Sequence, residues 1–310
     1  RNTNTINYDF KKILKSEDHH LNLLGGQEYI KTKGTTNTYD VRFYPSFFTS
    51  KEAFDLTTQG TPHTIDRFKN EDDVLFSFFG RVNYDYQSKY LFSATFRADG
   101  SSKFAEGNRW GYFPSAAVAW RISSEPFMDQ SRTWLEDLKL RASYGTAGNN
   151  NIPEGQYRTS YSSSSTGWVN NETSYWGTGK RMSNPDLKWE TTHTRNIGLD
   201  YTLFGGKISG SFEGYWNTTK DLLMDFNVRG SGYDTQYRNM GETQNKGFEA
   251  TINWNIISKR DYGISLGANI GFNKNRINSL GVMDDYFESS GWASTEIIGD
   301  YRVAVHGQVG

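Results

Sequence analysis

Residues 90–122, YLFSATFRADGSSKFAEGNRWGYFPSAAVAWRI, contain two runs in which every second residue is apolar, joined by a polar loop that contains glycine. Side chains on a β-strand point alternately to opposite faces, so each run predicts a strand with one apolar face. The apolar sets are Tyr90, Phe92, Ala94, Phe96 and Ala98 in the first run, and Trp110, Tyr112, Ala116, Val118, Trp120 and Ile122 in the second. The stretch therefore predicts a β-hairpin whose apolar face meets either a protein core or lipid.

Similar alternation recurs along most of the chain. It is clear in 74–86, 138–144, 189–203, 208–216, 248–256 and 262–272, and weaker in 1–14 and 19–29. The pattern predicts an all-β, antiparallel fold of about ten strands. A short helical connector is expected at 123–137, where Ser124 precedes Glu125-Pro126.

The predicted connections alternate between short and long. Short turns are expected at 15–18, 87–89, 204–206 and 258–261, and long loops at 31–70, 146–187 and 221–241. Outer-membrane barrels have short periplasmic turns and longer extracellular loops. The loop lengths therefore favour a transmembrane β-barrel over a soluble sandwich.

Composition agrees with a barrel that has a wet interior. The 310 residues include 15% aromatic residues, yet the mean hydropathy is −0.73, as expected when only half of each strand is apolar. The net charge of −1 and the absence of a basic stripe give no reason to expect nucleic acid. No apolar run is long enough for a transmembrane helix, and the chain contains no cysteine. Because it starts at Arg1 and shows no signal peptide, we expect a fragment or an incomplete chain.

Aromatic residues are expected to form two bands on the lipid face. Tyr and Trp favour the two membrane interfaces, although they also favour strands in general. The predicted interface residues are Tyr84, Tyr90, Trp120, Tyr201 and Trp254 near the short turns, and Trp110, Tyr112 and Trp189 near the long loops. The opposite face is expected to line the lumen, with Arg97, Asp99, Arg121 and Glu213.

No catalytic or metal site stands out. The five histidines are scattered, and adjacent His19 and His20 would face opposite sides of a strand. Asp99-Gly100-Ser101-Ser102 lacks the spaced carboxylates of a Ca²⁺ loop, although the external loops of a transporter can bind Ca²⁺. We therefore predict no enzyme, no cofactor and no metal site, with Ca²⁺ in the extracellular loops as the remaining possibility. The predicted substrate contacts are aromatic residues of the long loops: Trp168, Tyr175, Trp176, Tyr233 and Tyr237.

Several motifs resemble the SusC-like family of TonB-dependent outer-membrane transporters. They are RADGSSKF (97–104), RWGYFPSAAVAW (109–120), SEPFM (124–128), WLEDLKLRASYGTAGN (134–149), NPDLKWE (184–190), NIGLDY (196–201), KDLL (220–223) and NKGFEATINW (245–254). The resemblance implies a 22-stranded barrel plugged by an N-terminal domain. It also implies energisation by TonB, a SusD-like surface lipoprotein as a lid, and import of oligosaccharides or peptides.

The chain departs from the family pattern in what it lacks. No plug, TonB box or terminal barrel-closing strand is recognisable, so residues 1–310 are expected to be part of one transmembrane barrel domain. The predicted function is import of a nutrient oligomer across the bacterial outer membrane. Two alternatives remain open, an outer-membrane binding or structural barrel that does not transport, and a soluble all-β carbohydrate-binding protein.

Overall fold

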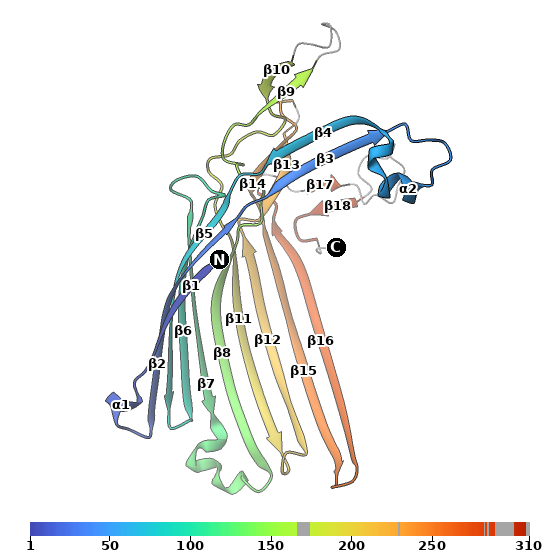
Figure 1. Cartoon of the computed structure of the whole chain (residues 1–310). Coiled ribbons are helices and arrows are strands. Elements are labelled where there is room, and N and C mark those ends of the chain that lie inside the picture. Colours follow the sequence, from blue (N-terminus) through green and yellow to red (C-terminus); the bar gives the residue numbers. More distant parts are fainter. Residues whose placement is uncertain (166–173, 229, 282, 284, 289–300, 308–310) are drawn as a thin grey trace.

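Ten long strands form a single antiparallel sheet. The computed structural model describes residues 1–165, 174–228, 230–281, 283, 285–288 and 301–307. The order across the sheet is β1 (Asn2–Asp9), β2 (His19–Thr32), β5 (Asp73–Tyr86), β6 (Tyr90–Ser101), β7 (Trp110–Arg121), β8 (Leu135–Asn149), β11 (Glu190–Leu203), β12 (Ile208–Lys220), β15 (Glu242–Ser258) and β16 (Gly263–Ser279). The sheet is curved and open, with β1 and β16 at its two edges (Figure 1). The predicted antiparallel fold of about ten strands is confirmed.

The register of the β6–β7 hairpin shows why its alternation matters. Tyr90 pairs with Trp120 and Phe92 with Val118, so the apolar sets of both strands share one face. This face does not pack against a core, because Tyr112 is 62% exposed and Val118 53% exposed. We call it the outer face and the opposite one the inner face. A contiguous apolar face of this kind needs a non-aqueous surrounding.

Short and long connections lie at opposite ends of the sheet, as predicted (Figure 1). The long-loop end carries three two-stranded hairpins: β3 (Thr35–Arg42) with β4 (Thr61–Lys69), β9 (Tyr161–Ser165) with β10 (Ser174–Thr178), and β13 (Leu223–Asn227) with β14 (Thr235–Asn239). Alternation did not reveal them, because β9, β10, β13 and β14 have only five residues each and β3 is mostly polar. A fourth small pair joins β17 (Asp285–Glu288) to β18 (Tyr301–Ala304).

Helical segments are few and short. They are α1 (Lys11–Leu14), α2 (Ser50–Asp55), η1 (Thr57–Gln59), η2 (Ile122–Ser124) and η3 (Pro126–Ser131). In the part of the chain that the structure describes, no helix is long and apolar enough to cross a membrane. The predicted helical connector is confirmed and consists of the 3₁₀ turns η2 and η3.

The connector is fastened to the outer face by one carboxylate. Oε1 of Glu125 accepts hydrogen bonds from the Tyr90 hydroxyl (2.6 Å) and from the Trp120 indole N–H (3.0 Å). These bonds favour the ionised form and hold the pKa of the Glu125 carboxyl below its usual range. Two rings of the predicted interface band are thus fixed in orientation at the short-turn end. The SEPFM motif contains this Glu.

A charge placed on the outer face tests its contact with lipid. Ala94→Arg is expected to destabilise the barrel of the full-length protein by about 2–4 kcal/mol, because along β6 Ala94 lies midway between Tyr90 at the short-turn end and Ala98, the partner of Tyr112, at the long-loop end. Val118→Arg is expected to cost less, since Val118 lies one row from Tyr90 and Trp120. Denaturant unfolding of the protein in lipid vesicles measures both.

The matched control is Ala117→Arg, which places the same charge on the inner face beside Val118. It should leave stability almost unchanged. Equal costs for Ala94→Arg and Ala117→Arg would contradict the assignment of the two faces.

Candidate functional site: the inner face and the loop core

The inner face carries paired charges across three strands. Arg97 of β6 donates from Nε to both carboxylate oxygens of Asp99 (2.8 and 2.9 Å). Its NH2 group donates to Ser77 Oγ of β5 (3.0 Å) and reaches Glu28 Oε2 of β2 at 3.4 Å. Glu28 and Ser77 are buried. Buried charges are retained where they are paired and hydrogen-bonded, so this network fixes the inner wall over β2, β5 and β6.

A second network spans β8, β11 and β12. Arg141 donates to Asp200 (3.2 Å) and to Glu213 (2.8 Å), and the Lys139 ammonium lies 3.0 Å from Asp200. The Arg141 guanidinium covers Gly198, where a Cβ atom would come within 2.7 Å of Arg141 Cζ. Any side chain at Gly198 would therefore displace the arginine. Glu213 was predicted from alternation, whereas Arg141 and Glu28 were missed although strand parity could have placed them.

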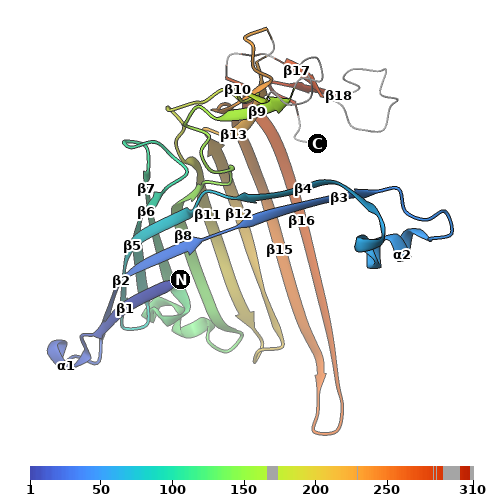
Figure 2. The same ribbon diagram turned by 45° about the horizontal axis from the view of Figure 1, so that its top comes forward.

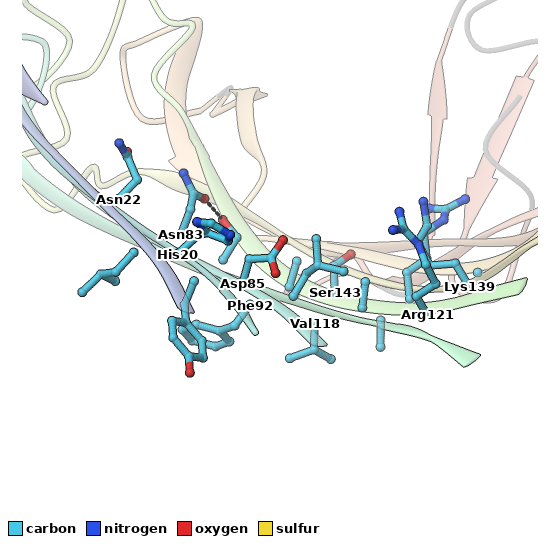
Figure 3. A pocket seen from close by; sticks show the side chains of 18 of the residues that line it. His20, Asn22, Asn83, Asp85, Phe92, Val118, Arg121, Lys139 and Ser143 are labelled. Atoms are coloured by element: carbon cyan, nitrogen blue, oxygen red, sulfur yellow. Dashed lines mark hydrogen bonds between the residues drawn. The ribbon is translucent and has the colours of Figure 1, made fainter. Parts of the chain in front are cut away.

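Beside Lys139 and Arg141 of the second network the inner face is hollowed (Figure 3). The hollow has a volume of about 640 Å³. Polar side chains lie on one side of the sheet here, and Phe92 and Val118 lie on the other. The labelled polar residues are His20, Asn22, Asn83, Asp85, Arg121, Lys139 and Ser143. The inner face can therefore bind water or polar protein groups, in contrast to the outer face.

A compact apolar cluster, the loop core, lies at the long-loop end. It consists of Phe104, Phe113, Ile152, Leu187 and Trp189, with Leu75, Leu223 and Tyr237 packed against it. Phe104 and Leu187 are completely buried. Full burial of a side chain of this size contributes about 1.5–3 kcal/mol. The cluster joins segments 100–109, 150–152, 184–189 and the β13–β14 hairpin into one unit.

Hydrogen bonds explain why the RADGSSKF and NPDLKWE motifs are specific in sequence. Ser101 Oγ accepts from Asn150 Nδ2 (3.0 Å), and Ser102 Oγ accepts from the Val74 backbone N–H (2.9 Å). Asn184 Nδ2 donates to the Tyr237 carbonyl (2.8 Å). The small polar residues thus satisfy backbone and amide groups around the loop core, while Phe104 and Leu187 fill it.

The interface prediction for Trp189 is wrong. The side chain is only 8% exposed, lies within the loop core, and donates its indole N–H to the Arg109 carbonyl (2.8 Å). The physical reason is that β11 begins at Glu190, so strand alternation does not extend to Trp189. The other predicted interface residues belong to outer-face sets of their strands: Tyr84, Tyr90, Trp110, Tyr112, Trp120, Tyr201 and Trp254.

Of the predicted substrate contacts, Tyr237 packs against the loop core with the Arg181 guanidinium 5.0 Å from its ring centroid. Tyr233 is half-buried in the turn that joins β13 to β14. Tyr175 and Trp176 belong to β10, but their side chains and residue Trp168 lie outside the described residues. The structure therefore describes the surroundings of Tyr233 and Tyr237 alone among these five residues. Among the described residues, no group of three or more His, Asp or Glu side chains could hold a metal ion.

The open sheet with an apolar outer face and a charged inner face defines a segment of a membrane β-barrel. Residues 1–301 match the family described as TonB dependent receptor-like, beta-barrel. The chain is 37% identical over 293 residues to TonB-dependent receptor P3 of Formosa agariphila, which covers 93% of this chain and 28% of that protein. It is 35% identical over 289 residues to TonB-dependent receptor SusC of Bacteroides thetaiotaomicron, covering 85% of this chain and 28% of SusC.

The fold comparison agrees. A solved structure of the RagAB peptide transporter superposes with a TM-score of 0.79 at 27% identity, covering 93% of this chain and 31% of that one. The chain therefore belongs to the TonB-dependent receptor family and is similar to its SusC-like members. It is part of a bacterial outer-membrane barrel, and the family comprises receptors and transporters, not enzymes. The chain spans about 28% of the curated relatives that it matches.

Removing the centre of the loop core tests its role. Phe104→Ala deletes a completely buried ring, and such changes cost about 3–5 kcal/mol. Because the cluster is local, we expect faster amide hydrogen exchange in 100–109, 150–152 and 184–189, while β11 and β12 stay protected. Hydrogen exchange with mass spectrometry on the full-length protein measures this.

The control is Phe43→Ala, which removes a ring that is 81% exposed at the same end of the sheet. It should leave exchange in the loop-core segments unchanged. Unchanged exchange in Phe104→Ala would show that the cluster does not stabilise the loops.

Proposed function

We propose that residues 1–310 form part of the barrel domain of a SusC-like, TonB-dependent importer of a nutrient oligomer, either an oligosaccharide or a peptide. The observation that carries the proposal is the sequence match to SusC together with the fold match to the RagAB peptide transporter, each over most of this chain. The paired charges of the inner face support it, because a polar wall suits a lumen that holds a plug domain and passes a polar substrate. TonB would act through a region outside residues 1–310.

The long-loop end is the proposed place of substrate binding. The loop core gives these loops a fixed shape, and exposed or half-buried aromatic rings such as Tyr233 can stack on sugar rings or peptide side chains. Trp168, Tyr175, Trp176, Tyr233 and Tyr237 remain the proposed contacts.

Deletion of the full-length gene is expected to abolish growth on one nutrient oligomer and leave growth on its monomer unchanged. Complementation with the wild-type gene should restore growth, and Tyr233→Ala should lower uptake of that oligomer without lowering the amount of protein in the outer membrane. Growth and radiolabelled uptake are the measurements. Unchanged uptake across a panel of glycans and peptides would favour a binding or structural barrel that does not transport.

A protruding arm, formed by β3, β4 and α2, is the proposed contact for a SusD-like surface lipoprotein. The arm leaves the sheet at β2 and β5 and extends toward the side of β15 and β16 (Figures 1 and 2). Phe43, Phe47 and Phe54 on it are 81%, 80% and 82% exposed. Phe43 also has a φ of +56°, in the left-handed region that phenylalanine rarely adopts. Exposed aromatic clusters on an ordered element are typical of protein interfaces.

The arm is ordered by its own contacts. Thr49 caps α2 in a capping box with Glu52, and Phe47 and Phe48 pack edge to face with ring centroids 5.3 Å apart. An ordered element that exposes three phenylalanines loses little conformational freedom when a partner covers it.

The double variant Phe47→Ser/Phe54→Ser is expected to reduce co-purification of the proposed SusD-like lipoprotein, because it removes two apolar anchors. Affinity purification of the tagged full-length barrel with quantitative mass spectrometry measures the ratio of the two proteins. Phe127→Ser serves as the control, since Phe127 is 66% exposed at the short-turn end. Equal ratios for the wild type and the double variant would rule out the arm as the contact.

A further inference from the structure

A row of cationic and aromatic side chains crosses the outer face near the long-loop end. The strand register places Tyr144, Arg195, Trp216, Lys246 and Lys274 side by side on β8, β11, β12, β15 and β16. The next outer-face row toward the loops contains His193 and Arg276. The cations therefore form a band rather than isolated surface charges.

The row on the other side of this band is apolar. It contains Ile197, Phe248 and Phe272, all of them exposed. Exposed phenylalanines in one row are followed by exposed lysines in the next outer-face row. A cation on the lipid face of a barrel costs about 2–4 kcal/mol at the midplane and about 0–1 kcal/mol near the interface. Lys246 and Lys274 therefore mark the edge of the hydrocarbon layer on β15 and β16 at the long-loop end. Because the strands of a barrel are tilted, the same register row reaches Ala94 on β6 at another depth.

A hollow of about 420 Å³ lies on this boundary. Trp216, Phe248 and Phe272 line it from the outer face, together with Lys246 and Lys274. Gly214 contributes no side chain to the same face, and only an Ile197 methyl lies within 4 Å of the position that a Cβ would occupy. The hollow thus has apolar walls below and two ammonium groups on its loop-side rim.

Among the described residues, no carboxylate pairs with the cations around the hollow. Within the described ranges, none of Arg195, Lys246 and Lys274 has a carboxylate oxygen within 4.0 Å. Lys246 and Lys274 are direct cross-strand partners, and like charges in that position are destabilising. On the inner face, in contrast, Arg97 and Arg141 each have carboxylate partners. An external anion would remove the repulsion between the two lysines.

We propose that this hollow binds a phosphate-bearing glycolipid of the outer leaflet. The phosphate group lies between Lys246 and Lys274, and an acyl chain lies along Phe248 and Phe272. Trp216 is the direct cross-strand neighbour of Lys246, at the membrane interface where an indole ring is favoured. Arg195 lies on the far side of Trp216, two strand spacings or roughly 10 Å from Lys246. It is available to a second anionic group of the lipid. The inference depends on the position of the barrel in the outer membrane and not on what the protein transports.

The test uses the full-length protein, delipidated and reconstituted in phosphatidylcholine nanodiscs, with monophosphoryl lipid A as the probe. Native mass spectrometry measures the bound lipid. The double variant Lys246→Gln/Lys274→Gln should bind lipid A at least about tenfold more weakly, because each charged hydrogen bond contributes about 1.5–3 kcal/mol. Lys246→Arg/Lys274→Arg should retain binding, which separates loss of charge from loss of folding.

A matched control changes two lysines at the other end of the same sheet. Lys207→Gln/Lys259→Gln lies in the short turns and should bind lipid A as the wild type does. The wild type should bind dephosphorylated lipid A weakly. Its affinity for that lipid should be about the same as the affinity of the double glutamine variant for monophosphoryl lipid A. Equal binding of lipid A by the wild type and the double glutamine variant would overturn the proposal, as would equal binding of the phosphorylated and dephosphorylated lipids. A change in oligomeric state with lipid binding unchanged would assign the hollow to a second copy of the chain and also overturn it.

Discussion

The hydrogen bonding of the backbone is the constraint on which the rest of this structure depends. Hydrocarbon offers no partner to a peptide N–H or C=O, so a strand in a membrane must be paired on both sides. The antiparallel ladder from β1 to β16 meets this requirement for its eight inner strands by joining each to its neighbour along the chain. Among the described strands, β1 and β16 each have one unpaired edge, which strands from the rest of a longer barrel would complete. The chain spans less than a third of its curated relatives, in agreement with this need.

The same constraint separates the chemistry of the two faces. Side chains alternate between the two faces of each strand. Where the outer face meets lipid, polar side chains are therefore confined to the inner face. The carboxylate partners of Arg97 and Arg141 come from several strands, so these networks also fix the register on the inner face. Charge reappears on the outer face where the hydrocarbon layer ends, at Lys246 and Lys274.

The loops at one end are a folded unit built on the barrel wall. Phe104 and Leu187 are buried together although they are far apart in the sequence, and Phe113 of β7 connects them to the sheet. Phe113 also lies over Gly111 and Gly148, where any Cβ would collide with its ring. Two family motifs thus have a structural purpose, because their small polar residues satisfy hydrogen bonds while their apolar residues fill the loop core.

The sequence alone determined the strands, the face of nearly every strand residue, the alternation of short and long connections, and the family. These features are local, because a period of two needs only neighbouring residues and the motifs are contiguous. The sequence could not show the loop core, the ion pairs of Arg141 or the hydrogen bonds to Glu125, since their members come from separate segments. Trp189 shows the difference most clearly. By sequence position it continues the alternation of residues 190–203, but β11 begins only at Glu190 and the ring is buried in the loop core. Only the tertiary structure decided which charges are paired and which are not. Lys246 and Lys274 lie opposite each other because the assembled sheet sets the register between strands.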